Sequence, residues 1–364
     1  MPQDGYQYML DLYREDGSSL GQVPVEVDWE PALNSVHFTA IRQGVRPPVI
    51  AIGPSRIEPI WSPEAGKPYL AGFRAVLLGN GDNTPFSSDI STTYLRGLAQ
   101  RASSHFVETG QLEPGDLFRY LVSAFPHEHE ETAQQTGIAG FCVKEIAAPL
   151  PIDDRPLGSL LSRSVLVGEP DEQDMPVFVS QHVLNEATAL TREAGAKETG
   201  GVLIGYLHRD TASPEVMAEI VAQIPAAHSH SELTKLTFTA ETWTAVRAAL
   251  ELRNDGTTML GWWHSHTFMT EMCKDCTKRK NGTCNATAAF MSADDCALHR
   301  TVFPRAWSVA LVVADSPCAG LTLAMFGWKY GMVTRRAFRV LQARRLHAPV
   351  ESASMANGGS KDAQ

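Results

Sequence analysis

Two histidines separated by one residue, His264 and His266, are the first candidates for chemistry in this chain. They follow the apolar run TTMLGWW, which is typical of a β-strand. Side chains two residues apart in a strand leave the same face, so both imidazoles can reach one metal ion. The same triplet occurs at His228 and His230, after Pro225, in an expected loop with no carboxylate at a matching spacing. We therefore expect only the second triplet to form a metal site.

A carboxylate that could complete the site lies in the segment SADD, where Ser292 and Asp295 are three residues apart. In the first turn of a helix this spacing puts both side chains on one face, and two histidines with one aspartate can bind zinc. The pattern Ser-x-x-acid is also an ordinary helix capping box. The two roles are compatible.

Glu198 is the candidate for a general base. A bound zinc ion can lower the pKa of its water to about 7, but attack on an amide still needs a carboxylate that accepts and delivers protons. Glu198 lies between an expected helix and the Gly-rich run GGVLIG, where a side chain can project over a sheet edge. A solvated acid at the end of a helix is the other interpretation.

The elements that must position these residues follow from hydrophobic periodicity. Strands are predicted for VFVS from Val177, GGVLIGYL from Gly200, PEVMAEIVAQI from Pro214, TTMLGWW from Thr257, WSVALVVAD from Trp307 and LTLAMFGW from Leu321. Helices are predicted for QHVLNEATALTREAGA from Gln181, TAETWTAVRAALELRND from Thr239, a short segment near Ser292 and RRAFRVLQARRL from Arg335. Strands that alternate with helices favour an α/β fold with a mixed sheet.

The blocks KETGGVLIG, GWWHSHTF and SADD, in this order, resemble the motif of the JAMM (MPN+) zinc metallopeptidases, over about residues 175–345. The resemblance implies a JAMM-type mixed sheet with flanking helices. It also implies that His264, His266 and Asp295 bind one catalytic zinc ion, that Glu198 is the acid/base, and that Ser292 helps to hold the oxyanion. Asp294 is an alternative ligand, although only Asp295 meets the Ser-x-x-Asp spacing.

A cysteine-rich insert at residues 273–296 departs from the family pattern, which has a short gap here, and it puts the substrate groove in doubt. The cysteines follow the pattern C-x2-C-x7-C-x11-C and could bind a second, structural zinc ion. The four are Cys273, Cys276, Cys284 and Cys296. His299 could replace one thiol, and free or redox-active thiols are the alternative.

Residues 1–165 are predicted to form a separate α+β domain without a catalytic motif. VIAIG from Val49 and FRAVLLG from Phe73 are typical of strands, and helices are predicted from Thr92 to about Glu108 and over LFRYLVSAF from Leu117. The PHEHEE run after residue 125 is interpreted as a solvated acidic loop rather than a metal site. The acidic, turn-prone GEPDEQDMP marks a boundary near residues 165–175, and residues 346–364 are expected to form a disordered tail.

The composition fits a folded enzyme. The chain has 364 residues, a length that suggests two domains, with 43% hydrophobic and 20% charged residues. Its net charge of -10 argues against a general nucleic-acid binder, which needs a basic face. The chain has no signal-peptide pattern and no apolar run long enough to span a membrane, so we expect a cytoplasmic protein without nucleic-acid or membrane partners.

The resemblance implies an isopeptidase or peptidase that cleaves after the C-terminus of ubiquitin or a ubiquitin-like protein. The WW-containing strand and the cysteine insert look similar to bacterial forms that act beside E1-like and E2-like proteins. One alternative is JAMM processing of a sulfur-carrier protein, which would use the same ligands. Another is a non-catalytic MPN scaffold, although such scaffolds usually lack the ligand set. A nucleobase deaminase, which combines a His-x-Glu motif with a Cys-x-x-Cys motif on zinc, is the least favoured alternative.

Overall fold

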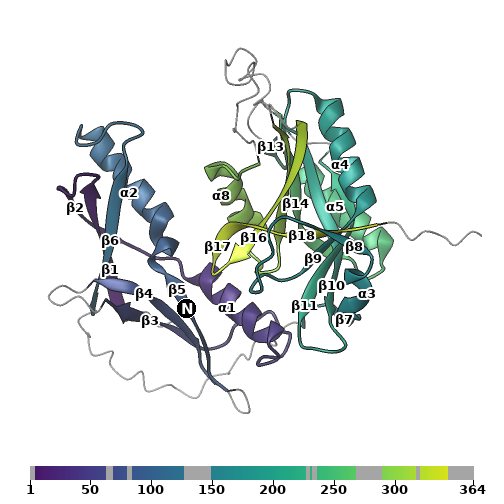
Figure 1. Ribbon diagram of the computed structural model, residues 1–364, viewed down its shortest axis with the longest axis horizontal. Coiled ribbons are helices and arrows are strands. Elements are labelled where there is room, and N and C mark those ends of the chain that lie inside the picture. Colours follow the sequence, from purple (N-terminus) through teal and green to yellow (C-terminus); the bar gives the residue numbers. More distant parts are fainter. Residues whose placement is uncertain are drawn as a thin grey trace, which may run out of the picture.

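The computed structural model describes residues 5–62, 69–79, 84–126, 149–226, 230–231, 236–267, 289–316 and 320–342. Figure 1 shows two groups of elements with helix α1 (Glu30–Arg42) between them. The smaller group comes from the first part of the chain, and the larger group is built around one long mixed sheet.

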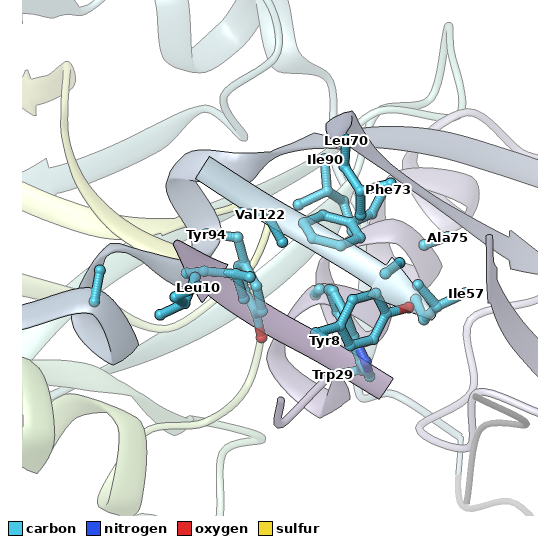
Figure 2. Close-up of a cluster of buried hydrophobic side chains, with 14 of the residues drawn as sticks. Tyr8, Leu10, Trp29, Ile57, Leu70, Phe73, Ala75, Ile90, Tyr94 and Val122 are labelled. Atoms are coloured by element: carbon cyan, nitrogen blue, oxygen red, sulfur yellow. The ribbon is translucent and has the colours of Figure 1, made fainter. Parts of the chain in front are cut away.

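The smaller group contains two three-stranded antiparallel sheets, in the orders β2-β1-β6 and β3-β4-β5. Their elements are β1 (Tyr6–Arg14), β2 (Ser19–Val25), β3 (Ser55–Trp61), β4 (Leu70–Leu77), β5 (Phe86–Ser91), η1 (Thr92–Leu95), α2 (Arg96–Glu108) and β6 (Phe118–Pro126). Figure 2 shows aromatic side chains at the centre of the core, where the ring of Trp29 contacts the rings of Tyr8, Phe73 and Tyr94. The Trp29 and Tyr94 rings are stacked at 5.4 Å.

Two predictions for this part are confirmed and two are wrong. FRAVLLG lies in β4, and the helix expected from Thr92 to Glu108 is formed by η1 and α2. VIAIG is not a strand, because a turn at Pro47 and the left-handed Gly53 leave only an isolated bridge at Val49. LFRYLVSAF is the strand β6 rather than a helix. It pairs with β1 along its whole length, and this pairing outweighs the local helical pattern.

Helix α1 was not predicted, because its apolar residues lie on two faces instead of one. Ala32, Leu33 and Val36 are buried in the core of the smaller group. Phe38 and Ile41 are buried in the core of the large sheet. The helix therefore packs against the cores of both groups, and its sequence lacks the single apolar stripe of an ordinary amphipathic helix.

The large sheet has the order β17-β16-β15-β14-β10-β11-β9-β18-β8, and β7 pairs beside β10. The strands are β7 (Ile152–Asp154), β8 (Ser164–Val167), β9 (Val177–Ser180), β10 (Gly200–Arg209), β11 (Val216–Pro225), β14 (Thr258–His266), β15 (Val309–Ser316), β16 (Gly320–Lys329), β17 (Met332–Arg336) and β18 (Phe338–Leu341). The pair β14-β15 is parallel, whereas β10 is antiparallel to both β11 and β14. The predicted mixed sheet is confirmed, as are the predicted strands from VFVS to LTLAMFGW.

Helices cover both faces of this sheet. Alternate residues of each strand belong to different cores, as with Trp262 and Trp263. The Trp263 side is covered by α4 (Gln181–Ala194) and by α1. The Trp262 side is covered by α5 (Ala240–Arg253) and α8 (Ala293–Val302). The predicted helices near Gln181, Thr239 and Ser292 are confirmed.

The basic helix predicted for RRAFRVLQARRL is wrong within the described residues. The segment enters β17 and then β18, which lies between β9 and β8 in the sheet. Phe338 and Leu341 are buried in different cores, so both faces of this strand are covered and the two-residue alternation is lost.

The large sheet also includes strands from before the predicted boundary near residues 165–175. β7, β8 and the short helix α3 (Leu157–Leu161) all precede residue 168, and both β7 and β8 pair with strands of the large sheet.

Several predictions fall on residues outside the described ones. These are His127 and His129 of the acidic run, His228, the insert residues Cys273, Cys276 and Cys284, and the tail at 346–364. Among the helices that the structure describes, none has the length and apolar character needed to cross a bilayer.

Candidate metal centre

The two histidines of the predicted site lie at the C-terminal end of β14. Because they are two residues apart in a strand, both rings leave the sheet on the side of Trp262. Their Nε2 atoms are 2.9 Å apart, and the two side chains are only 0% and 2% exposed. The Trp262 ring stacks on the His264 ring at 4.4 Å and 13°, and this contact fixes the orientation of the imidazole.

Asp295 reaches the same point from the first turn of α8. Its Oδ2 atom is 3.4 Å from Nε2 of His264 and 3.5 Å from Nε2 of His266. The predicted capping box is present, since the backbone N–H of Ser292 donates to Oδ2 of Asp295 and the backbone N–H of Asp295 donates to Oγ of Ser292. One carboxylate therefore caps its helix and faces both histidines. Asp294 is exposed and lies outside the group.

The three donor atoms fit a tetrahedral metal ion. Zinc binds histidine nitrogen and carboxylate oxygen at about 2.0–2.2 Å, which puts two ligand atoms about 3.3 Å apart in a tetrahedron. The observed separations of 2.9, 3.4 and 3.5 Å lie around this value. Among the described residues, these three side chains form the group that could hold a metal ion.

The ionisation states also suit a cation. Burial lowers the pKa of His264, so this imidazole is neutral and can donate a lone pair. Burial alone would raise the pKa of Asp295, but the hydrogen bonds with His264 and His266 outweigh it and hold the pKa well below its usual range. Nδ1 of His264 is buried without a hydrogen-bond partner among the described residues, and the stacked Trp262 ring orients the imidazole from its face.

Glu198 lies just outside this set of ligands. Its Oε1 atom is 4.0 Å from Nε2 of His266, and the residue is 4% exposed. A solvated acid at a helix end is therefore excluded. Burial raises the pKa of Glu198 to about 7, with His266 opposing the shift and Asp295 adding to it. A carboxyl group of this pKa can both accept and release a proton near neutral pH.

Ser265 positions the segment that carries Glu198, and the sequence analysis missed this role. Ser265 points to the face opposite the two histidines and is completely buried. Its Oγ accepts a hydrogen bond of 2.9 Å from the N–H of Thr199, and its own N–H donates to the Thr199 carbonyl at 2.8 Å. The alternation of side chains along a strand was the available signal. It puts Ser265 on the face opposite the two histidines, toward the segment that precedes β10.

A buried hydrogen bond connects α8 to β14 in a second contact that the sequence analysis missed. The indole N–H of Trp262 donates to Nδ1 of His299 at 3.1 Å. His299 is completely buried, and burial lowers its pKa to about 3, so the ring is neutral and can accept. It lies among the rings of Phe303 and Trp328. These contacts argue against His299 as a substitute for a cysteine ligand.

The Gly-rich start of β10 allows a close approach between strands. A Cβ atom on Gly201 would lie 2.5 Å from the Ile224 carbonyl oxygen and 2.7 Å from Nε1 of Trp263. That nitrogen donates instead to Oε1 of Gln223 at 3.0 Å. Glycine at this position therefore lets β10, which follows Glu198, pack tightly beside the strand of the histidines.

Two other predicted sites are only partly described. His230 begins the short strand β12 (His230–Ser231), which pairs with β13 (Leu236–Thr237), and its role stays a prediction. Cys296 follows Asp295 in α8 and is half-buried, and burial raises the pKa of its thiol. The other three cysteines of the proposed second zinc site lie outside the described residues.

Comparison with known proteins identifies a JAB (MPN-like) domain in this chain. Residues 180–270 match the family described as prokaryotic homologs of the JAB domain. The match includes Glu198, His264 and His266 and ends before Asp295. No curated protein matches the chain.

One similar solved structure is the solution structure of protein DSY2949 from Desulfitobacterium hafniense. It is 20% identical, and the similarity covers 47% of this chain and 95% of that protein with a TM-score of 0.30. At this TM-score the likeness supports no argument about fold or function.

Proposed function

We propose that the JAB-like domain is a zinc-dependent peptidase that cleaves the peptide or isopeptide bond after the C-terminus of a ubiquitin-like protein. The observation that carries the proposal is the convergence of His264, His266 and Asp295 on one point, with the buried carboxyl group of Glu198 beside it. The substrate class rests on the JAMM resemblance. In this proposal the partners are a ubiquitin-like protein, its conjugates, and E1-like and E2-like proteins of the same cytoplasmic pathway.

The side chains divide the chemistry between them. His264, His266 and Asp295 would hold the zinc ion, which when bound supplies a Lewis acid that polarises the scissile carbonyl and acidifies water. Glu198 accepts a proton from the attacking water as the carbon–oxygen bond forms. It then delivers that proton to the amine nitrogen as the carbon–nitrogen bond breaks.

Ser292 would act on the developing oxyanion. A serine hydroxyl can accept and donate at the same time. In the capping box Oγ accepts from the N–H of Asp295, so its own O–H stays available as a donor. A hydrogen bond to the carbonyl oxygen that strengthens as charge develops would stabilise the transition state.

Two further roles complete the proposal. Cys273, Cys276 and Cys284 of the insert, together with Cys296 on α8, would bind a structural zinc ion that connects the insert to the helix of a proposed catalytic ligand. The total would be two zinc ions per chain, falling to one when Cys273 and Cys276 are both replaced by serine. One zinc ion in both proteins, measured by mass spectrometry, would exclude the second site. The elements of residues 1–165 would recognise the substrate or a partner.

Two alternatives use the same fold differently. A sulfur-carrier substrate would keep the same ligands and differ only in the protein that docks. A non-catalytic scaffold would not need a complete donor set with a buried carboxyl group beside it, and the presence of all these groups favours an enzyme.

A panel of fusion proteins tests the proposed substrate class. The full chain is incubated with ubiquitin-like proteins and with sulfur-carrier proteins, each extended by a short tail after its C-terminal glycine, and products are identified by mass spectrometry. We expect cleavage of the ubiquitin-like fusions, loss of cleavage after chelation and recovery with added zinc. Cleavage restricted to the sulfur-carrier fusions would favour the alternative, and no cleavage of any fusion would favour the scaffold.

A further inference from the structure

A concave site lies where α1 meets the large sheet, and none of the residues of the candidate metal centre lines it. Its volume is about 590 Å³, within the range of about 300–1,000 Å³ that is usual for small-molecule sites. Its walls come from α1, β5, the segment before β9 and the hairpin of β16 and β17. The buried apolar side chains in the wall are Phe38, Met175, Ala306 and Trp328.

Arg336 is the unusual charged residue of this wall. It is 6% exposed, and within the described residues its guanidinium makes one hydrogen bond, from Nη2 to the carbonyl oxygen of Met175. Its Nε is buried without a partner. Burial lowers the pKa of Arg336 to about 10, with Asp174 and Asp171 opposing the shift and Arg42 adding to it. The side chain therefore carries its charge at neutral pH.

The other two cations of the cavity wall have anionic partners, and Asp174 lies near enough to raise the pKa of Arg336 without forming an ion pair with it among the described residues. Arg42 forms a two-point ion pair with Glu215, with distances of 2.6 and 3.0 Å. Lys329 pairs with Asp171, and the remaining carboxylate, Glu172, is exposed. In the part of the chain that the structure describes, Arg336 has no such ion pair. A buried guanidinium without an anion is costly, so this site favours a negatively charged partner.

The strand beside Arg336 leaves room for its side chain. A Cβ atom on Gly327 would lie 2.8 Å from Nη1 and 2.9 Å from Cδ of Arg336. Any side chain at position 327 would therefore displace the guanidinium. Glycine on β16 keeps Arg336 in the wall of the cavity.

We propose that this cavity binds a small oxyanion with a planar apolar body, an aromatic phosphate or carboxylate, whose oxygens pair with Arg336 and whose body packs between Phe38 and Trp328. A planar guanidinium fits either oxyanion through paired hydrogen bonds. The site is distinct from the metal centre, and its occupation does not depend on peptidase activity.

Calorimetric titration of the full chain with phenyl phosphate, benzoate and inorganic phosphate tests this site. We expect saturable binding of phenyl phosphate or benzoate, and the tighter of the two identifies the anion as phosphate or carboxylate. Arg336→Met should weaken that binding by at least about 10-fold, which corresponds to about 1.4 kcal/mol. The matched control is Arg335→Met, which removes the same charge from an exposed neighbour on the same strand and should leave affinity unchanged.

Thermal unfolding gives a second readout. Without a probe, Arg336→Met should be at least as stable as the wild type, because a buried unpaired charge has been removed. The probe should stabilise the wild type and not the variant. If Arg336→Met fails to fold, Gly327→Ala serves instead. Its methyl group displaces the Arg336 guanidinium and should weaken binding of the probe.

Three results would overturn the proposal. The first is the absence of saturable binding of phenyl phosphate and benzoate at up to about 10 mM, a concentration that would saturate a site with a Kd of about 1 mM. The second is equal affinity in the wild type and both of the variants Arg336→Met and Gly327→Ala. The third is inorganic phosphate binding as tightly as phenyl phosphate, which would show that the apolar wall contributes nothing.

Discussion

Replacing Ser265 by alanine should slow hydrolysis without removing zinc. The hydroxyl of Ser265 is completely buried and accepts the N–H of Thr199 at 2.9 Å, next to the proposed general base Glu198. The alanine variant leaves this N–H unpaired in the interior, which costs about 1–3 kcal/mol. The backbone bond from Ser265 to the Thr199 carbonyl, at 2.8 Å, remains and limits the movement.

The effect on rate follows from the position of Glu198. Oε1 of Glu198 is 4.0 Å from Nε2 of His266. A small displacement of the Glu198 backbone would therefore change the path of the proton between the attacking water and this carboxylate. Loss of a residue that orients an active-site group typically costs about 10–100-fold, and we expect kcat to fall within this range with KM nearly unchanged. Zinc content should stay at the wild-type value, since Ser265 faces away from both histidines.

The measurement combines kcat, KM, zinc content and the free energy of unfolding for the variant. Ser123→Ala is the matched control, because it also removes a buried hydroxyl, which donates to Asp11 at 2.6 Å in the smaller group of elements. The control should lose stability and keep kcat. Ser265→Thr, which retains the hydroxyl, should recover most of the rate. Wild-type kcat in Ser265→Ala together with a stability loss like that of Ser123→Ala would refute a positioning role.

Two further predictions concern α8 and the buried Glu219 of β11. His299→Leu removes the acceptor of the hydrogen bond from the Trp262 indole, at 3.1 Å. This variant should bind zinc about 10-fold or more weakly, because Asp295 lies one turn away on the same helix. Competition with a zinc chelator measures the affinity, and an unchanged affinity would contradict the prediction. Glu219 is 5% exposed. Burial would raise its pKa, but contacts with His208, Arg155 and Arg163 outweigh burial and lower the pKa below the ordinary value of 4.5. A depressed pKa stabilises the fold above about pH 4.5, and this contribution is lost as the pH falls through the lowered value, so the stability gap between wild type and Glu219→Gln should close on acidification below pH 4.5. A gap that stays constant in urea titrations from pH 7 to about pH 3 would contradict this assignment.

The convergence of His264, His266 and Asp295 could be predicted from the sequence because each part of the group has a local signal. An apolar strand that ends in His-x-His directs two imidazoles to one side, and the Ser-x-x-Asp pattern is a helix start in itself. The structure brings these segments together, and the Asp295 carboxylate both caps α8 and faces the two histidines. The burial of Glu198 could not be predicted, because it depends on how the chain before β10 packs beside His266.

The errors fall where tertiary contacts decide the structure. β6 and β18 have residue patterns compatible with helices and become strands because β1, β8 and β9 pair with them. Helix α1 was missed because it is apolar toward two cores at once. Strand alternation separates Ser265 from the two histidines, but its partner Thr199 lies 66 positions away and could not be predicted from a single sequence.

The most direct test of the proposed peptidase is the rate of Glu198→Gln at full zinc occupancy. The substrate is the fusion that the wild type cleaves, and Glu193→Gln is the control because Glu193 is an exposed glutamate at the end of α4. We expect Glu198→Gln to bind as much zinc as the wild type and to cleave at least about 100-fold more slowly, whereas Glu193→Gln should be unchanged. Cleavage by Glu198→Gln at a rate near that of the wild type, with zinc bound, would exclude Glu198 as the general base.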